Sequence, residues 1–158
     1  MPCHFLKAKF LAFLKDRVTV IDMADDMKNI LAFDTALSGI SVALDVQGRL
    51  MTRQIDTARE QASLLVPLLQ EVLEEGGIDF KDLDALACTI GPGSFTGLRI
   101  GMTTAKTLGL AIGKPVIGVN TLDLMAHHYD VNKPMIIVLE TKRQDFYACY
   151  YDINKKAF

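Results

Sequence analysis

A glycine-rich run in the middle of the chain constrains the fold most strongly. Residues 91–101 read Gly-Pro-Gly-Ser-Phe-Thr-Gly-Leu-Arg-Ile-Gly and directly follow the apolar stretch 84–90. Glycine permits turns and close backbone approaches that other residues exclude, and Ser94 or Thr96 can cap a helix that starts near Gly97. We therefore expect a buried strand that turns abruptly into a helix.

Such a turn offers the free N–H groups of a helix N-terminus to an anion. The run lacks the Lys followed by Ser or Thr of a Walker loop, and its glycines do not have the Gly-x-Gly-x-x-Gly spacing of a dinucleotide-binding loop. Gly91, Gly93 and Ser94 are candidate phosphate-binding residues. The glycines could equally serve turning and packing alone, and both interpretations stay open.

Asp34 and Thr35 are the second candidate phosphate-binding pair. They follow the apolar strand predicted at 29–34, so a carboxylate and a hydroxyl stand at the edge of the sheet where the glycine-rich loop also emerges. They could contact a phosphate or a metal–phosphate group. The alternative is that they organise the turn before Ser38 and Gly39.

The pattern of apolar residues predicts the order of elements over residues 29–129. Three closely spaced strands, at 29–34, 40–45 and 49–55, must form an antiparallel meander. A helix, a strand, a helix, a strand and a helix are then expected at 59–75, 84–90, 97–112, 116–119 and 121–129. This order is typical of a ribonuclease-H-like α/β lobe with a mixed sheet.

The two ends of the chain differ from this lobe. Residues 1–26 combine Phe-Leu pairs with lysine and arginine, and Met27 directly precedes the first strand, so we expect an N-terminal extension. The lobe itself is expected at 27–132. Strands at 135–140 and 146–152 then predict a hairpin, and residues 133–158 are expected to begin a truncated second lobe because a lone hairpin is only marginally stable.

Composition narrows the function further. Half of the 158 residues are hydrophobic and the net charge is −2, which fits one globular core without a broad basic face, so the chain alone should bind RNA poorly. Three widely spaced cysteines fit a reducing, cytoplasmic location, and no apolar stretch is long enough to span a membrane.

His127 and His128 are adjacent and cannot jointly hold one metal ion from a helix. We predict no catalytic residue and no metal ligand.

A stripe of small residues marks the helix after the glycine-rich loop. It recurs at every fourth position and comprises Gly97, Gly101, Ala105 and Gly109. Glycine inside a helix costs roughly 1 kcal/mol relative to alanine, so the stripe calls for close packing. The partner could be the chain's own sheet or first helix, or another subunit.

Four segments together resemble one protein family. They are residues 27–35 (Met-Lys-Asn-Ile-Leu-Ala-Phe-Asp-Thr), 41–44 (Ser-Val-Ala-Leu), the run 91–101, and 115–119 (Pro-Val-Ile-Gly-Val) with Thr-Leu at 121–122. They closely resemble the bacterial TsaB (YeaZ) family of tRNA threonylcarbamoyladenosine biosynthesis proteins, and the resemblance covers residues 27 to about 152. It implies an actin-like, sugar-kinase-like fold of two ribonuclease-H-like lobes.

The resemblance also implies a role. The chain would be a non-catalytic subunit that forms a heterodimer with the catalytic subunit TsaD, and through it organises TsaE, for the addition of threonylcarbamoyl to the adenosine beside the tRNA anticodon. It makes the small-residue stripe, together with Leu65, Leu68 and Leu69, the preferred subunit interface. ATP and Mg²⁺ would act only at the level of the complex, and tRNA would bind only indirectly.

Two alternatives to the heterodimer remain at this stage. One is a homodimer through the same helices. The other is a stand-alone nucleotide-binding phosphotransferase or ATPase of the actin-like superfamily that uses Asp34, Thr35 and the loop at 91–94.

Overall fold

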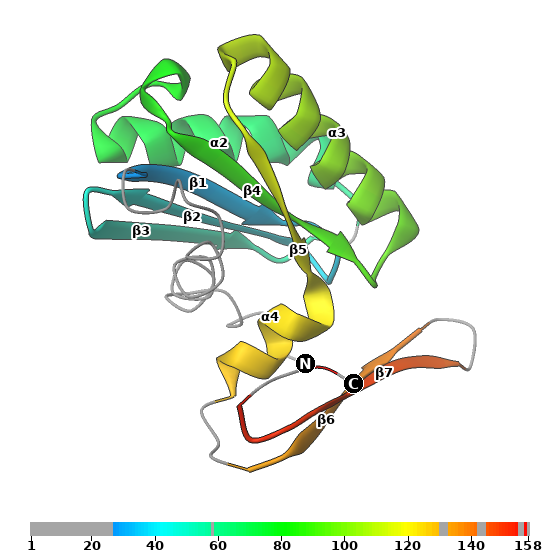
Figure 1. Ribbon diagram of the computed structural model, residues 1–158. Coiled ribbons are helices and arrows are strands. Elements are labelled where there is room, and N and C mark those ends of the chain that lie inside the picture. Colours follow the sequence, from blue (N-terminus) through cyan, green and yellow to red (C-terminus); the bar gives the residue numbers. More distant parts are fainter. Residues whose placement is uncertain (1–26, 58, 130–132, 142–144, 155–156, 158) are drawn as a thin grey trace.

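The computed structural model describes residues 27–57, 59–129, 133–141, 145–154 and 157 (Figure 1). Five strands form one sheet in the order β3-β2-β1-β4-β5. In chain order they are β1 (Asn29–Asp34), β2 (Ile40–Val46), β3 (Arg49–Ile55), β4 (Ala85–Gly91) and β5 (Val116–Asn120). The predicted residues 1–26 extension lies outside the described part of the chain.

The directions of the strands identify the fold. β1 pairs antiparallel with β2, with Leu31 opposite Leu44, and β2 pairs antiparallel with β3. On its other side β1 pairs parallel with β4, which pairs parallel with β5. A three-stranded meander continued by two parallel strands is the ribonuclease-H-like arrangement of actin-like proteins, so the predicted mixed sheet is confirmed.

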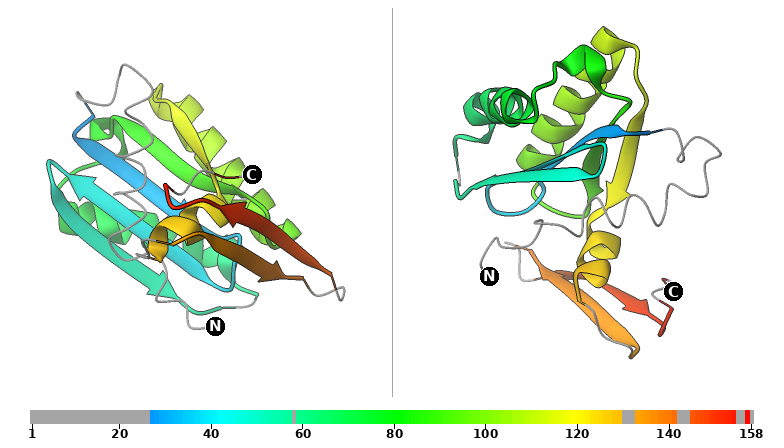
Figure 2. Two further views of the ribbon diagram at one scale, coloured as in Figure 1. Left: turned by 60° about the horizontal axis from the view of Figure 1, so that its bottom comes forward. Right: turned by 90° about the vertical axis from the view of Figure 1, so that its left-hand side faces the viewer.

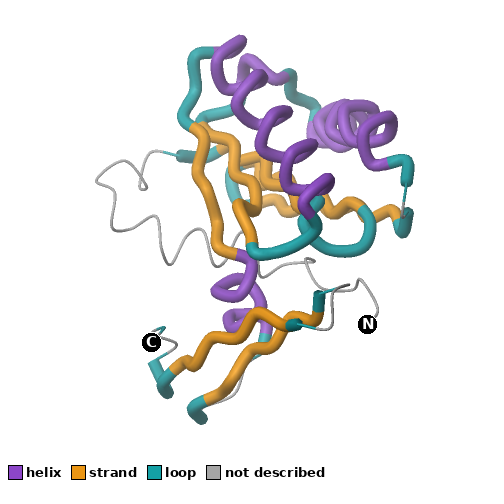
Figure 3. Tube along the Cα trace, turned by 90° about the vertical axis from the view of Figure 1, so that its right-hand side faces the viewer, coloured by secondary structure: helices purple, strands orange, loops and turns teal. Residues whose placement is uncertain are grey.

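Two helices cover one face of this sheet. Figures 1 and 3 show α2 (Gln61–Gly76) and α3 (Phe95–Ile112) on the side opposite α4 (Thr121–His128). A short 3₁₀ helix, η3 (Phe80–Asp82), connects α2 to β4. α3 begins two residues earlier than predicted because Ser94 is its N-cap, and its Oγ accepts a hydrogen bond from the Gly97 N–H.

The main core lies between the sheet and these two helices. Buried leucines of α2 meet the apolar side chains of β1, β2 and β4 there. Leu65, Leu68 and Leu69 are between 0 and 5% exposed, so they belong to this core. The expectation that they form a subunit interface is therefore wrong, because their side chains have no surface to offer a partner.

The small-residue stripe of α3 also packs against other parts of the same chain. Gly97, Gly101, Ala105 and Gly109 are all buried. A Cβ atom on Gly97 would collide with the Thr35 carbonyl oxygen, one on Gly101 with the Thr35 hydroxyl, and one on Gly109 with Val116. The expectation that this stripe is a subunit interface is corrected as well: it packs against the chain's own sheet, the alternative that the sequence left open.

The predicted hairpin is present and rests on α4. β6 (Met135–Glu140) and β7 (Phe146–Tyr151) form a separate two-stranded sheet, which lies against α4 and away from the large sheet (Figure 2). Ile137 and Tyr151 are buried against Leu122, Met125 and Ala126 of α4. The opposite face of the hairpin is open to solvent, and Ile136 is 65% exposed there.

A hydrogen bond joins the hairpin to α4. The Tyr151 hydroxyl, on a fully buried ring, donates to Asp123 Oδ1 at 2.7 Å. Burial and this hydrogen bond raise the pKa of Tyr151, so the phenol stays protonated. No helix in the described part of the chain has the length and apolarity that crossing a membrane requires.

The packing of α3 predicts the effect of one methyl group. Gly97→Ala forces the Thr35 backbone away from the helix, so we expect the free energy of unfolding to fall by about 1 to 3 kcal/mol in urea denaturation. Thr103→Ala on the exposed side of α3 is the control and should stay within about 0.5 kcal/mol of the parent. An alanine variant at position 97 as stable as the parent would contradict the packing described.

The hairpin contact predicts a second effect. Tyr151→Phe keeps the buried ring and removes the hydrogen bond to Asp123, which should cost about 1 to 3 kcal/mol because the acceptor is a carboxylate. Hydrogen exchange of the β6 and β7 amides should accelerate correspondingly. Tyr147→Phe, in the same strand but half exposed, serves as the control and should leave exchange unchanged.

Candidate functional site

The glycine-rich loop lies at the carboxyl end of β4, where the sheet meets the start of α3. Gly91 has a φ of 109°, a conformation that favours glycine, and the Gly91–Pro92 peptide bond is cis. The loop then passes so close to the β1–β2 connection that a Cβ atom on Gly93 would be 2.5 Å from the Ala36 carbonyl oxygen. The Ser94 N–H donates a hydrogen bond of 2.7 Å to that same oxygen.

Asp34 lies beneath this loop and is 3% exposed. Its Oδ1 accepts hydrogen bonds from the Ala36 N–H at 3.0 Å and from the Thr89 hydroxyl at 2.5 Å. Burial raises the pKa of this carboxyl above its ordinary value, although these hydrogen bonds act in the opposite direction. The side chain therefore holds together the ends of two neighbouring strands.

Thr35 joins three parts of the fold. Its hydroxyl donates to the Gly97 carbonyl oxygen at 2.7 Å, and its own carbonyl oxygen accepts from Gln61 Nε2 at 3.2 Å. Gln61 also donates to the Gly39 carbonyl oxygen at 2.6 Å. Gln61 is 8% exposed at the start of α2, and sequence reasoning missed it because a polar residue in a first helical turn is usually solvated.

These contacts bring the predicted phosphate-binding residues together, but most of the polar groups of these residues already form hydrogen bonds within the chain. Asp34, Thr35 and Gly91 are buried, and the polar side chains of the first two bond within the chain. This is the arrangement that the turn-organising alternative expects. Gly93 and Ser94 lie nearer the surface, yet the Ser94 N–H is already bonded to the Ala36 carbonyl oxygen.

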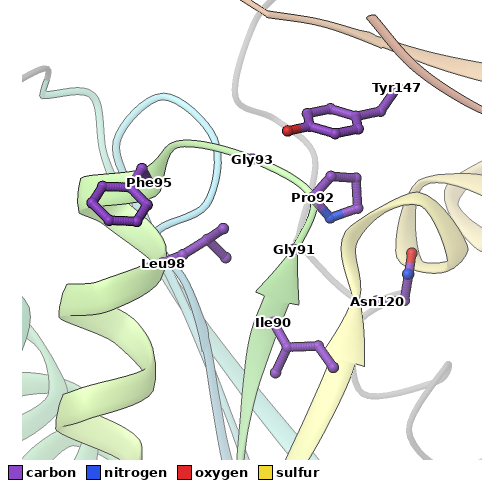
Figure 4. A pocket seen from close by; sticks show the side chains of 8 residues that line it. All are labelled: Ile90, Gly91, Pro92, Gly93, Phe95, Leu98, Asn120 and Tyr147. Carbon is purple, nitrogen blue, oxygen red and sulfur yellow. The ribbon is translucent and has the colours of Figure 1, made fainter.

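A hollow of about 500 Å³ opens beside the loop (Figure 4). Its walls come from the end of β4, the loop, the first turn of α3, the end of β5 and β7. The lining residues are Ile90, Gly91, Pro92, Gly93, Phe95, Leu98, Asn120 and Tyr147. Tyr147 reaches this hollow because it lies on the same face of the hairpin as Cys149 and Tyr151, the face turned toward the lobe.

Other reactive side chains lie apart from this hollow. Burial raises the pKa of the Cys88 thiol to about 11, so this cysteine is a poor nucleophile. In the described part of the chain, no three His, Cys, Asp or Glu side chains come together as a metal site. His127 Nδ1 lies 3.1 Å from the Asp123 carbonyl oxygen of its own helix.

The burial of Asp34 predicts a pH dependence. The folded state holds the proton more tightly than the unfolded state, so Asp34 contributes stability below its ordinary pKa near 3.8 and loses it as the pH rises through the raised value. Asp34→Asn keeps an acceptor and carries no charge. In urea denaturation this variant should therefore gain stability relative to the parent between pH 4 and pH 7.5; a constant difference over that range would contradict the assignment.

Comparisons with known proteins agree with this architecture. Residues 53–158 match the model of the family described as TsaD, tRNA N6-adenosine threonylcarbamoyltransferase. The TsaB protein of Escherichia coli is 43% identical over 97 residues, which cover 61% of this chain and 42% of that protein. The structure of YeaZ from Pseudomonas aeruginosa superposes with a TM-score of 0.74 at 30% identity and covers 80% of this chain.

The matches also define how far the likeness extends. The tRNA N6-adenosine threonylcarbamoyltransferase of Erythrobacter litoralis is 44% identical over 66 residues, 42% of this chain and 19% of that protein. The superposition on YeaZ covers 61% of the YeaZ chain, so this chain spans less than two thirds of these relatives. The predicted family is confirmed: the chain belongs to the TsaB (YeaZ) family.

Proposed function

We propose that the chain is a non-catalytic subunit in the biosynthesis of threonylcarbamoyladenosine in tRNA, where it binds and organises TsaD. The observation that carries the proposal is the match of one lobe to both TsaB proteins and the TsaD family model. Two proteins with related lobes can associate through equivalent surfaces around an approximate two-fold axis.

The outer faces of α2 and α3 are the proposed contact surface, in place of the buried residues discussed above. Leu110 of α3 is 85% exposed and Val66 of α2 is 39% exposed, on the side of the helices away from the sheet. These two exposed apolar side chains are the contacts through which the proposed surface can be tested. Such a contact leaves the stripe of α3 in its place against Thr35.

The charges of the two helices support this geometry. α2 carries Glu71, Glu74 and Glu75 and no basic residue, and Arg53 of β3 pairs with Glu71 and Glu75, so Glu74 is the α2 glutamate outside these ion pairs. α3 carries Arg99 and Lys106 and no acidic residue. A two-fold arrangement that places α2 of one lobe beside α3 of a related lobe brings opposite charges together. The same complementarity permits a homodimer when the partner is absent.

The other components named in the proposal would act through TsaD and not through this chain directly. TsaE would join through TsaD, ATP and Mg²⁺ would act at the level of the complex, and tRNA would be held by the complex in the cytoplasm. The burial of Asp34 argues against the alternative of a stand-alone ATPase, because a buried carboxyl that is bonded within the chain is a poor ligand for a metal–phosphate group.

Co-purification tests the contact surface. Val66→Glu and Leu110→Glu place a charge on the proposed surface without entering the core, so each should reduce the recovery of TsaD at least tenfold. Val138→Glu makes the same change at a half-exposed site on the hairpin and should leave the recovery unchanged. Full recovery of TsaD with both helix variants would refute the proposed surface, as would equal loss with the hairpin variant.

A further inference from the structure

Both faces of the large sheet are buried, although the described helices cover them unequally. The far face, on the side of α4, is formed by Ile30, Ala32, Ala43, Ala87 and Val119, each at most 4% exposed. α4 packs there against β4 and β5. Among the described elements, those with extensive contacts to β2 and β3 are the neighbouring strands and α2, and α2 lies on the other side (Figure 1). The burial of β2 on the far face therefore requires a further segment.

The residues of β2 on this face are small or polar. Ser41, Ala43 and Asp45 alternate with the core side chains of the strand, and all three are buried. An antiparallel sheet with one face in water usually carries exposed polar side chains on that face. A serine, an alanine and an aspartate that are all buried indicate that another layer of the protein packs directly over them.

The chain enters the lobe on this same face. The side chain of Met27 packs against the far-face cluster. The backbone beside it is held in place, because the Lys28 N–H donates to Asp84 Oδ2 at 2.8 Å and the Lys28 carbonyl oxygen accepts from the Gln47 N–H at 2.7 Å. The 26 residues that precede Met27 are therefore tethered beside the far face.

The sequence of these residues suits such a layer. Leu6, Phe10, Phe13 and Leu14 have the i, i+4, i+7, i+8 spacing of one helical face. A helix over residues 5–18 would be about 21 Å long, which is close to the length of a strand of six or seven residues. Residues 19–26 can span about 26 Å when extended, so they are long enough to connect this helix to Met27.

The charges of the segment and of the far face are complementary. Residues 4–17 include three lysines and one arginine but a single aspartate. On the far face the carboxylate of Asp45 is buried, and its Oδ1 accepts a hydrogen bond from the Gly48 N–H at 2.7 Å. A buried carboxylate favours a cationic side chain near it, which a lysine or the arginine of the segment can supply.

We propose that residues 5–18 form an amphipathic helix that packs on the far face of the sheet over β1 and β2. Its leucine and phenylalanine side chains contact Ala32 and Ala43, whose small size allows a close approach, and a basic side chain lies near Asp45. The N-terminal extension is then a structural layer of the lobe. It lies on the side of the sheet opposite the surface proposed for TsaD, so the two proposals are independent.

Methyl NMR of the full 158-residue chain tests this contact directly. With labelled alanine, leucine and phenylalanine, we expect NOEs from the Ala32 and Ala43 methyl groups to side chains of residues 5–18. A sample that mixes labelled with unlabelled chains separates contacts within one molecule from contacts between two copies. NOEs found only between molecules would assign the far face to a second copy and overturn the proposal.

Two matched variants show whether the apolar side of the helix is responsible. Phe10→Glu places a charge on the side that faces the sheet, so hydrogen exchange of the β2 amides should accelerate about tenfold or more. Phe5→Glu makes the same change about 140° away around the helix and should exchange as the parent does. If Phe10→Glu fails to fold, the NOEs of the parent chain still decide the outcome.

Three further outcomes would count against the proposal. They are the absence of NOEs between residues 5–18 and the far face, unchanged exchange in Phe10→Glu, and equal acceleration in Phe5→Glu. None of these measurements uses TsaD. A failure of the co-purification experiment would therefore refute the proposed function and leave the helix on the far face to be judged by itself.

Discussion

The contact between Thr35 and Gly97 is the constraint on which this lobe depends. The Thr35 hydroxyl bonds to the Gly97 carbonyl oxygen, and the two backbones approach so closely that no side chain fits between them. Gln61 adds the start of α2 to the same junction. One buried group of hydrogen bonds therefore fixes the first helix, the second helix and the loop between β1 and β2 relative to the sheet.

This junction also determines what the glycine-rich loop can bind. Close packing beneath the loop engages the Ser94 N–H, which could otherwise bind an anion, and the Asp34 carboxyl, which could otherwise contact a metal–phosphate group. The surface that remains above the loop is apolar and aromatic. The same sequence motif thus packs against the chain on its inner side and lines a hollow on its outer side.

Much of the fold was predictable because each element carries a local signal. The short strands of the meander, the Gly76-Gly77 stop of α2 and the polar turn of the hairpin are readable without tertiary information, and the element boundaries agree within about two residues. Local sequence does not determine which neighbour each face of a helix packs against. A stripe of small residues indicates that another segment packs closely against the helix. Whether that segment is Thr35 of the same chain or part of another subunit depends on the tertiary structure, in which Gly101 packs against Thr35. The hollow was unpredictable for a similar reason, since Phe95 of α3 and Tyr147 of β7, which both line it, are about fifty positions apart in the sequence.

The connection between β5 and α4 has a mechanical consequence. Asn120 is both the last residue of the strand and the N-cap of the helix, so no loop separates them. α4 in turn carries the hairpin through Asp123 and Tyr151. The position of the hairpin relative to the lobe therefore depends on α4, which is joined to β5 at Asn120 and packs against the sheet through Leu124. Tyr147 is held beside the glycine-rich loop by this packing.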